Sequence, residues 1–169
     1  HNAHGGPLAI VGSVRDITEQ VEARQALVQS EQRFRNVFEG SQDAIVLQDP
    51  QHRVLYANRA ALAWIGRPLA DIVGHPLDQA AAHLGEMVTV WSRRVEAVLQ
   101  TGQAIPAADR FDLGDRVAYA ESLSMPLEDA AGHVYAVATI ARDVTARHLG
   151  EVALRESELR ARALFESIG

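Results

Sequence analysis

The alternation of apolar and polar residues predicts a β-hairpin near residue 50, followed by a short helix. Residues 43–48 and 53–57 are short runs rich in Val, Leu and Ile, and the four residues between them include Asp and Pro, as turns do. Asn58 is suited to accept a hydrogen bond from the first free backbone N–H groups of a helix that runs to Ile65. Gly66 is suited to end that helix, because glycine adopts the left-handed conformation of a helix C-cap.

A longer apolar stripe and three strand-like runs fill the second half of the chain. Between residues 83 and 100 apolar side chains recur at steps of three and four, which predicts one helix with a buried side. Three runs bounded by turn residues, 104–112, 116–125 and 133–143, predict strands. The order of elements predicts an α+β domain, in which helices cover one face of an antiparallel sheet.

An internal repeat organises the chain. The sequence Arg-Asp-Ile-Thr at residues 15–18 recurs as Arg-Asp-Val-Thr at 142–145, and an offset of 127 aligns 15–42 with 142–169 without a gap. Eleven of these 28 positions are identical, which indicates a tandem array of related modules. We therefore expect a strand remnant of a preceding copy at 1–18, a linker helix at 19–41, the domain core at 42–145, and an exit linker helix with the start of a following copy at 146–169.

Each linker helix carries a narrow stripe of apolar and small residues on an otherwise polar surface. Such a stripe suits a parallel pairing of helices from two chains, and we expect a homodimer formed in this way. Packing of each helix onto its own domain would explain the same stripe. The stripe consists of Ala23, Ala26, Leu27, Ser30, Phe34, Val37 and Phe38 on the first helix, and of Gly150, Ala153, Leu154, Ser157, Ala161, Leu164 and Phe165 on the second.

Composition excludes several classes of function. The net charge of −6 gives no electrostatic reason to bind nucleic acid, and no apolar run approaches the roughly 20 residues that span a bilayer. The absence of cysteine excludes disulfides, thiolate metal sites and cysteine-based photochemistry. No phosphate-binding glycine loop, metalloprotease motif or nucleophile elbow occurs, so we predict neither an enzyme nor a metal site. We expect a cytoplasmic protein that does not insert into membranes.

Several short motifs, in their order and spacing, resemble the PAS family over residues 30–145. The resemblance implies a five-stranded antiparallel sheet curled around a small cavity, which in the family holds haem, flavin, a metabolite or nothing. It also implies a sensory or signal-relay module of a multidomain bacterial protein, such as a histidine kinase or a cyclic-dinucleotide enzyme. The motifs are Ser-Glu-Gln-Arg-Phe-Arg at 30–35, Asp-Ala-Ile at 43–45, Val-Leu-Tyr-Ala-Asn at 54–58, Gly-His-Pro-Leu at 74–77, Pro-Leu-Glu-Asp at 126–129 with Gly132, and Arg-Asp-Val-Thr at 142–145.

The resemblance assigns signal transfer to the closing Asp and Thr of each repeat. Asp143 and Thr145 would tie the last strand to the exit helix, and Asp16 and Thr18 would do so in the preceding copy. Their side chains can accept hydrogen bonds from the backbone donors where a strand becomes a helix, although plain N-capping explains them equally well. The partners so implied are the adjacent PAS and output domains of the parent chain.

Small residues on one predicted strand favour a cavity. Residues 116–125 alternate between a small set (Ala, Ala, Ser, Ser) and a larger set that includes Leu123 and Met125. If the small set faces inward, either neighbouring aromatic residues or a small-molecule ligand must fill the space, because protein interiors are close-packed. In the opposite register Leu123 and Met125 form the core. The candidate pocket residues are Trp64, His83, Met87, Trp91, Phe111, Ala120, Ser122 and Ser124.

Three hypotheses follow for the function. The first is the sensory or relay module, with a small-molecule or conformational input passed to the output through a helical linker. The second is a ligand-free dimerisation and spacer module. The third is a redox or gas sensor, in which His83 would ligate haem or a tryptophan would stack on flavin. We expect no cofactor, and the colour of the purified protein would discriminate the third hypothesis.

Overall fold

A computed structural model describes residues 18–112, 114 and 116–168. The chain divides after Asn36 into two compact units. In the described residues the first unit is the greater part of helix α1 (Thr18–Gly40), and the second holds the sheet domain together with helix α6 (Thr145–Ile168). The two helices correspond to the predicted linker helices.

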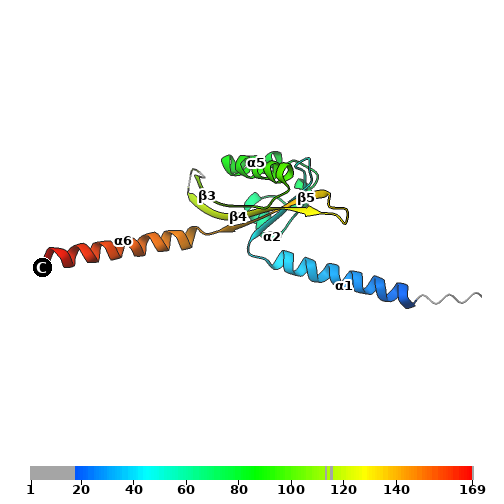
Figure 1. The fold of residues 1–169 in the computed structure, drawn as a ribbon, viewed down its shortest axis with the longest axis horizontal. Helices are drawn as coiled ribbons and strands as arrows, with labels where there is room; N and C mark the ends of the chain where they lie inside the picture. The colour runs from blue at the N-terminus through cyan, green and yellow to red at the C-terminus, as the bar shows by residue number, and fades with distance from the viewer. Residues whose placement is uncertain (1–17, 113, 115, 169) are drawn as a thin grey trace, which may run out of the picture. The chain divides into compact units, whose positions relative to one another are not determined.

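Five antiparallel strands form one sheet in the order β2-β1-β5-β4-β3. Figure 1 labels three of them, β3, β4 and β5. Strand β5 lies at its centre, where Ile140 pairs with Ile45 of β1 on one side and with Leu123 of β4 on the other. The architecture confirms the predicted α+β fold with its antiparallel sheet. The strands are β1 (Ala44–Gln48), β2 (Val54–Ala57), β3 (Ile105–Asp112), β4 (Val117–Glu128) and β5 (Val134–Asp143).

The segment between β2 and β3 supplies the helices that cover the sheet. They are α2 (Arg59–Ile65), α3 (Leu69–Ile72), α4 (Leu77–Ala80), the 3₁₀ helix η1 (Ala82–Leu84) and α5 (Glu86–Thr101).

The caps of α2 are those that the sequence predicts. The Asn58 side chain accepts a hydrogen bond from the Ala61 N–H, and Gly66 ends the helix with a φ of 68°. The predicted start of the long helix at His83 is wrong. Gly85, with a φ of 54°, separates η1 from α5, so His83 lies on η1 and the long helix begins at Glu86.

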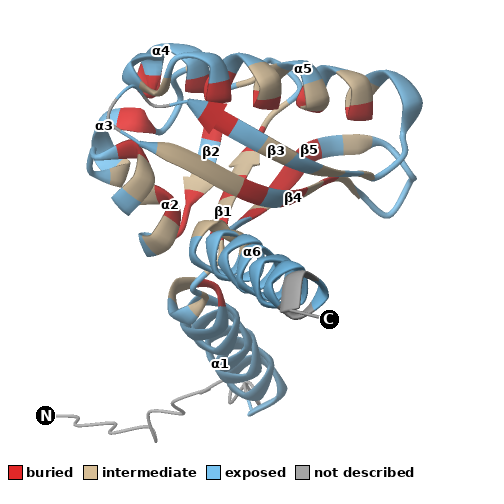
Figure 2. Ribbon diagram, turned by 90° about the vertical axis from the view of Figure 1, so that its left-hand side faces the viewer, coloured by how far each residue is buried: buried red, intermediate tan, exposed pale blue. Residues whose placement is uncertain are grey.

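The hydrophobic core lies between the sheet and α5, where the buried residues of both gather (Figure 2). On β4, Ala120, Ser122 and Ser124 are buried, whereas Leu123 and Met125 on the opposite face are half-buried. The small set of this strand therefore faces the core, which is the register that favours a cavity. The buried residues of α5 are Met87, Val88, Trp91, Val95 and Val98.

Candidate functional site

The cavity between the sheet and helices α2 and α5 is almost filled. Its volume is about 10 Å³, which is the space of roughly one water molecule. The rings of Trp64 and Trp91 stack with centroids 6.0 Å apart, and Phe111 packs edge-on against Trp91 at 6.2 Å. These aromatic side chains occupy the space that the small residues of β4 leave open.

The structure brings most of the candidate pocket residues to this region. Trp64 and Trp91 line the cavity. Trp64, Met87 and Ala120 line a second hollow of about 40 Å³ beside it. His83 is exposed on η1 and lines neither hollow. The interpretation of His83 as a haem ligand in the pocket therefore has no support in the described walls, because Gly85 ends η1 and leaves His83 outside α5.

Two of the candidate serines take part in polar contacts inside the core. The hydroxyls of Ser124 and Thr139 lie 3.0 Å apart, within hydrogen-bond distance. The Ser122 hydroxyl accepts a hydrogen bond of 3.1 Å from Arg94, whose guanidinium also pairs with Asp109 at 2.5 Å. Sequence analysis missed this half-buried ion pair; the available signal was an aspartate in the middle of a predicted strand.

Two buried side-chain atoms in the described residues have no hydrogen-bond partner. They are Nε1 of Trp91 and Oδ2 of Asp109. Such atoms are rare in folded proteins, because a polar group that loses its hydration without a replacement partner destabilises the fold. Trp91 also lines the cavity.

The first turn of α6 is bonded to strand β4. The Asp143 carboxylate accepts a 2.8 Å hydrogen bond from the Thr145 N–H, and the Thr145 hydroxyl accepts one of 2.9 Å from the Tyr119 N–H. The Val144 N–H in turn donates to the Tyr119 carbonyl at 2.8 Å. Asp143 and Thr145 thus join the end of β5, the start of α6 and the first residues of β4.

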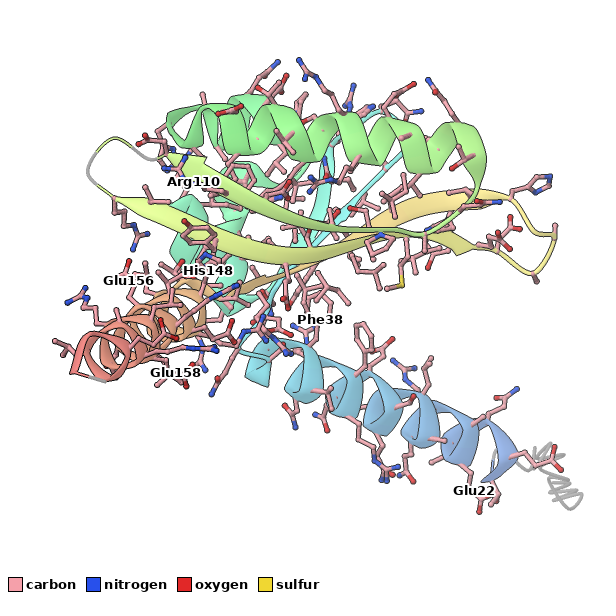
Figure 3. The ribbon with its side chains drawn as sticks, turned by 60° about the vertical axis from the view of Figure 1, so that its left-hand side comes forward. Glu22, Phe38, Arg110, His148, Glu156 and Glu158 are labelled. Carbon is pink, nitrogen blue, oxygen red and sulfur yellow. The ribbon has the colours of Figure 1, made fainter. Side chains whose placement is uncertain are left out.

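Side chains extend this attachment along β4. The ring of His148, labelled on α6 in Figure 3, stacks on Tyr119 with centroids 4.0 Å apart. Arg147 forms an ion pair with Glu121. Tyr119 and Asp143 also line the second hollow, together with Trp64. One wall of the cavity and the start of the exit helix therefore border the same space. Of the residues assigned to the preceding copy, Thr18 begins α1 and Asp16 lies outside the described residues.

Asn58 holds the end of α1 against the core. Its amide nitrogen donates to the carbonyl oxygens of Phe38 at 3.0 Å and Asp43 at 2.9 Å. Its amide oxygen accepts from the N–H groups of Ile45 and Ala61, both at 2.9 Å. The side chain is completely buried, so these four bonds replace its hydration. Sequence analysis identified only the bond to the α2 backbone.

Two further side chains complete the attachment of α1. The buried ring of Phe38 packs edge-on against Tyr56, with centroids 4.9 Å apart. The Glu39 carboxylate accepts hydrogen bonds from the Tyr56 hydroxyl and, at 2.9 Å, from the Arg59 N–H. Figure 3 labels Phe38 near the end of α1.

An exposed ion pair links the start of β1 to the end of β5. The Arg142 guanidinium donates two hydrogen bonds of 2.8 Å to the two carboxylate oxygens of Asp43. These hydrogen bonds, with the positive charge of Arg142, hold the pKa of Asp43 below its ordinary value, against the smaller opposing effect of burial. Elsewhere, hydrogen bonds from the backbone N–H groups of His133 and Ala131 lower the pKa of Asp129 in the β4–β5 turn.

The described residues include neither a membrane-spanning helix nor a metal-binding cluster. None of their helices is both long enough and apolar enough to cross a membrane. They also contain no cluster of three or more His, Cys, Asp or Glu side chains arranged to hold a metal ion.

Comparison with known proteins identifies relatives. The family model of the PAS fold matches residues 38–149. Sporulation kinase E of Bacillus subtilis is 28% identical over 153 residues, which cover 90% of this chain and 20% of the kinase. The two-component sensor PprA of Pseudomonas aeruginosa is 30% identical over 145 residues, 85% of this chain and 16% of the sensor. The chain thus spans a fifth or less of each of these relatives.

A solved structure supports the same fold. The PAS domain of BvgS from Bordetella pertussis superimposes with a TM-score of 0.57 at 19% sequence identity, over 79% of this chain and 98% of that one.

Proposed function

The chain belongs to the PAS-fold family, and we propose that it is a sensory or signal-relay module that passes an input to an output domain through α6. The similarity to sensor kinases supports a role in signalling. The observation that carries the proposal is the attachment of the first turn of α6 to β4, through Thr145 and Tyr119. Any displacement of β4 is transmitted to the helix through these contacts.

The relay requires two arrangements of the domain that the input distinguishes. An input that binds both arrangements equally well does not change their populations. To change the ratio of the two arrangements from 1:99 to 99:1, the input must bind one of them more favourably by roughly 5.5 kcal/mol. The stacked pair of Tyr119 and His148 and the ion pair of Arg147 with Glu121 are the contacts that would differ between the two arrangements. In the proposed parent protein the output domain is a histidine kinase or a cyclic-dinucleotide enzyme in the cytoplasm.

We also propose that α6 pairs in parallel with α6 of a second copy. The two leucines of the α6 stripe, Leu154 and Leu164, are exposed. The rest of the stripe expected from the sequence is exposed as well, at every position whose side chain is described on α6 and as far as Val37 on α1. Pairing of the chains would remove these apolar side chains from water.

A ligand-free dimerisation and spacer module is the alternative. The observation that favours it is the cavity volume of about 10 Å³, which leaves no space for an organic ligand in this arrangement of the walls. The relay and the spacer differ in what the junction does. In a relay, the bond between Thr145 and β4 controls the output, whereas in a spacer only the pairing of helices matters.

A hybrid kinase tests the proposal. Residues 1–169 are joined in helical continuity to the dimerisation and catalytic core of a sensor histidine kinase, and autophosphorylation is measured for the parent hybrid and for Thr145→Val. The substitution removes the hydroxyl that accepts from the Tyr119 N–H and nearly preserves side-chain shape. The relay predicts that it changes autophosphorylation several-fold, with the dimer mass unchanged in light scattering.

Thr101→Val is the matched control. Thr101 lies at the exposed end of α5, where its hydroxyl donates to the Ala97 carbonyl and accepts from the Gln103 N–H at 3.2 Å, far along the chain from the junction with α6. The control is expected to leave autophosphorylation as in the parent hybrid. If Thr145→Val and Asp143→Ala both behave like this control, the junction has a structural role only and the spacer hypothesis replaces the relay.

A further inference from the structure

We infer that the last turn of α6 is a docking segment for a second core of this type, which follows α6 in the parent protein. Phe165 and Glu166 of that turn bind the next core as Phe38 and Glu39 bind this one. The inference goes beyond the proposed relay and does not depend on it, because it concerns the other end of the helix.

The core has a site that receives the end of a helix. The last carbonyl groups of an α-helix and the first N–H groups of the next one lack partners within their own helices. Here the Asn58 amide donates to the Phe38 carbonyl at 3.0 Å. The Arg59 N–H, the first of α2, donates to the Glu39 carboxylate at 2.9 Å. The end of α1 and the start of α2 therefore satisfy each other.

The same site accepts an aromatic ring. Phe38 is the only buried residue of α1, a helix whose residues are all described. Its ring packs edge-on against Tyr56, and the hydroxyl of that tyrosine donates to Glu39. A helix that ends in Phe-Glu thus finds an apolar surface and two hydrogen-bond donors in one place. A partner for the end of α6 must present this combination.

The end of α6 carries the same two residues in the same register. Twenty residues separate the Thr that begins each helix from the Phe, since 38 − 18 and 165 − 145 are equal. An exposed position between them differs, with Phe34 in α1 and Ala161 in α6. Glu166 is exposed and pairs only at 3.3 Å with Arg162 of its own helix, so its carboxylate is accessible. Pairing of two α6 helices needs apolar residues but no glutamate directly after the phenylalanine.

Helix geometry places the two attachments of α6. An α-helix rises about 1.5 Å and turns about 100° per residue, so twenty residues correspond to roughly 30 Å and roughly 200°. The attachments at Thr145 and Phe165 therefore lie about 30 Å apart, on nearly opposite sides of the helix. Because both belong to one continuous helix, the inference predicts a fixed connection between successive cores.

An exchange of helix sequences tests the docking segment. In the exchanged chain residues 145–166 take the place of residues 18–39, which are equal in number, and the rest is kept. The α6 sequence then stands before the core, as the leading copy, and after it, as the trailing copy. Glu166→Ala is made in one copy or the other, so that each variant is the matched control of its counterpart. Urea unfolding followed by circular dichroism measures the stability.

The leading copy is expected to respond and the trailing copy is not. In the leading copy Glu166→Ala raises the equilibrium constant for unfolding about tenfold, the effect of a lost acceptor of roughly 1.4 kcal/mol. It also accelerates hydrogen exchange of the Arg59 N–H, which is protected in the exchanged chain as in the unmodified one. In the trailing copy the constant changes less than about twofold, because an exposed pair contributes little. Equal responses of the two copies, or none in the leading copy, would overturn the inference.

A doubled chain provides the test if the exchanged chain does not fold. Residues 1–166 are followed directly by residues 40–169, so that the first core keeps α1 and the second follows α6. The protein contains no cysteine, so Arg110→Cys at the exposed position on β3 gives one spin label in each core. Double electron–electron resonance, on labelled chain diluted with unlabelled chain, measures the distance between the cores.

We expect one narrow distance distribution in the doubled chain. Phe165→Ala combined with Glu166→Ala at the junction is expected to broaden it, because the second core then loses its attachment. A distribution that is broad from the start, or that keeps its width in the double variant, would overturn the inference. These outcomes are separate from a failure of the proposed relay, since the hybrid kinase tests Thr145 at the start of α6.

Discussion

Helices α1 and α6 are built from the same repeated sequence. The domain core contacts α1 at its C-terminal end and α6 at its N-terminal end. The repeat aligns Phe38 and Glu39 of α1 with Phe165 and Glu166 of α6. In α1 the last turn is attached, because Glu39 accepts hydrogen bonds from Tyr56 and from the backbone of the next helix. In α6 the equivalent Glu166 is exposed and pairs with Arg162 of its own helix at 3.3 Å.

The comparison shows that one sequence serves two kinds of attachment. The Asp and Thr at the start of α6 bind the sheet that precedes the helix, and the Phe and Glu at the end of α1 bind the core that follows it. A helix that carries both signals is suited to connect one core to the next. Each copy of the repeat carries the residues of both attachments, and the structure shows the last-turn attachment in α1 and the first-turn attachment in α6.

Loss of the Asn58 amide is expected to have the largest effect on stability. Asn58→Ala leaves the carbonyls of Phe38 and Asp43 and two N–H groups without partners, so we expect a loss of about 3–4 kcal/mol in the free energy of unfolding. Urea unfolding followed by circular dichroism measures it. Asn58→Ser retains a capping oxygen for α2 and should lose roughly half as much. A loss below about 1 kcal/mol for Asn58→Ala would show that α1 is not held through this side chain.

Glu39→Ala and Glu166→Ala compare the two helix ends directly. We expect Glu39→Ala to lower the free energy of unfolding by about 1–2 kcal/mol, because it deprives the half-buried Tyr56 hydroxyl and the Arg59 N–H of their acceptor. Glu166→Ala removes one exposed pair within a helix and should stay within about 0.5 kcal/mol of the parent. The same urea experiment serves both variants. Equal losses of unfolding free energy at the two positions would contradict the distinction between Glu39, which is attached to the core, and Glu166, which pairs only within its own helix.

The smallest expected effect is the pH dependence of the Asp43–Arg142 pair. This pair links the start of β1, which follows α1, to the end of β5, which precedes α6. Because Arg142 lowers the pKa of Asp43 in the folded state, the pair stabilises the fold above the ordinary carboxyl pKa of 3.8. That stabilisation is lost as the pH falls through the lower, folded-state pKa. The contribution is small, because the guanidinium is largely exposed.

Parallel unfolding of the parent and Arg142→Met, from neutral pH to below 3.8, measures this contribution. The difference in free energy of unfolding between the parent and Arg142→Met should be constant near neutral pH and should decrease as the pH falls below 3.8. Arg110→Met, at an exposed arginine of β3, controls for the loss of one positive charge. A difference that grows toward low pH would reverse the assigned sign.

Local signals in the sequence predicted most of the fold. The β1–β2 hairpin and the cap at Asn58 each depend on residues close together in the chain. The sequence left the register of β4 open, and the burial of Ala120, Ser122 and Ser124 decides it. The start of α5 was missed by three residues. An apolar stripe continues across η1, and only the backbone of Gly85 shows the break.

The site was harder to predict because it depends on contacts between distant residues. Asn58 donates a hydrogen bond to the carbonyl of Phe38, twenty positions earlier in the chain. Arg94 of α5 pairs with Asp109 of β3. The contact of Asn58 with Phe38 leaves no pattern in the sequence, and the pair of Arg94 and Asp109 leaves only an aspartate in the middle of a predicted strand. The volume of the cavity likewise depends on how Trp64 and Trp91 pack, and side-chain packing is not encoded in periodicity.

Hydrogen exchange at two amides tests most directly whether the domain holds the two helices through separate contacts. The Tyr119 N–H donates to Thr145 beside α6, and the Ile45 N–H donates to Asn58 beside α1. We predict that Thr145→Val accelerates exchange at Tyr119 about tenfold, as loss of one hydrogen bond implies, and leaves Ile45 unchanged. Asn58→Ser should do the reverse. Equal acceleration at both amides in either variant would contradict the account, because α1 and α6 would then be held by one cooperative unit.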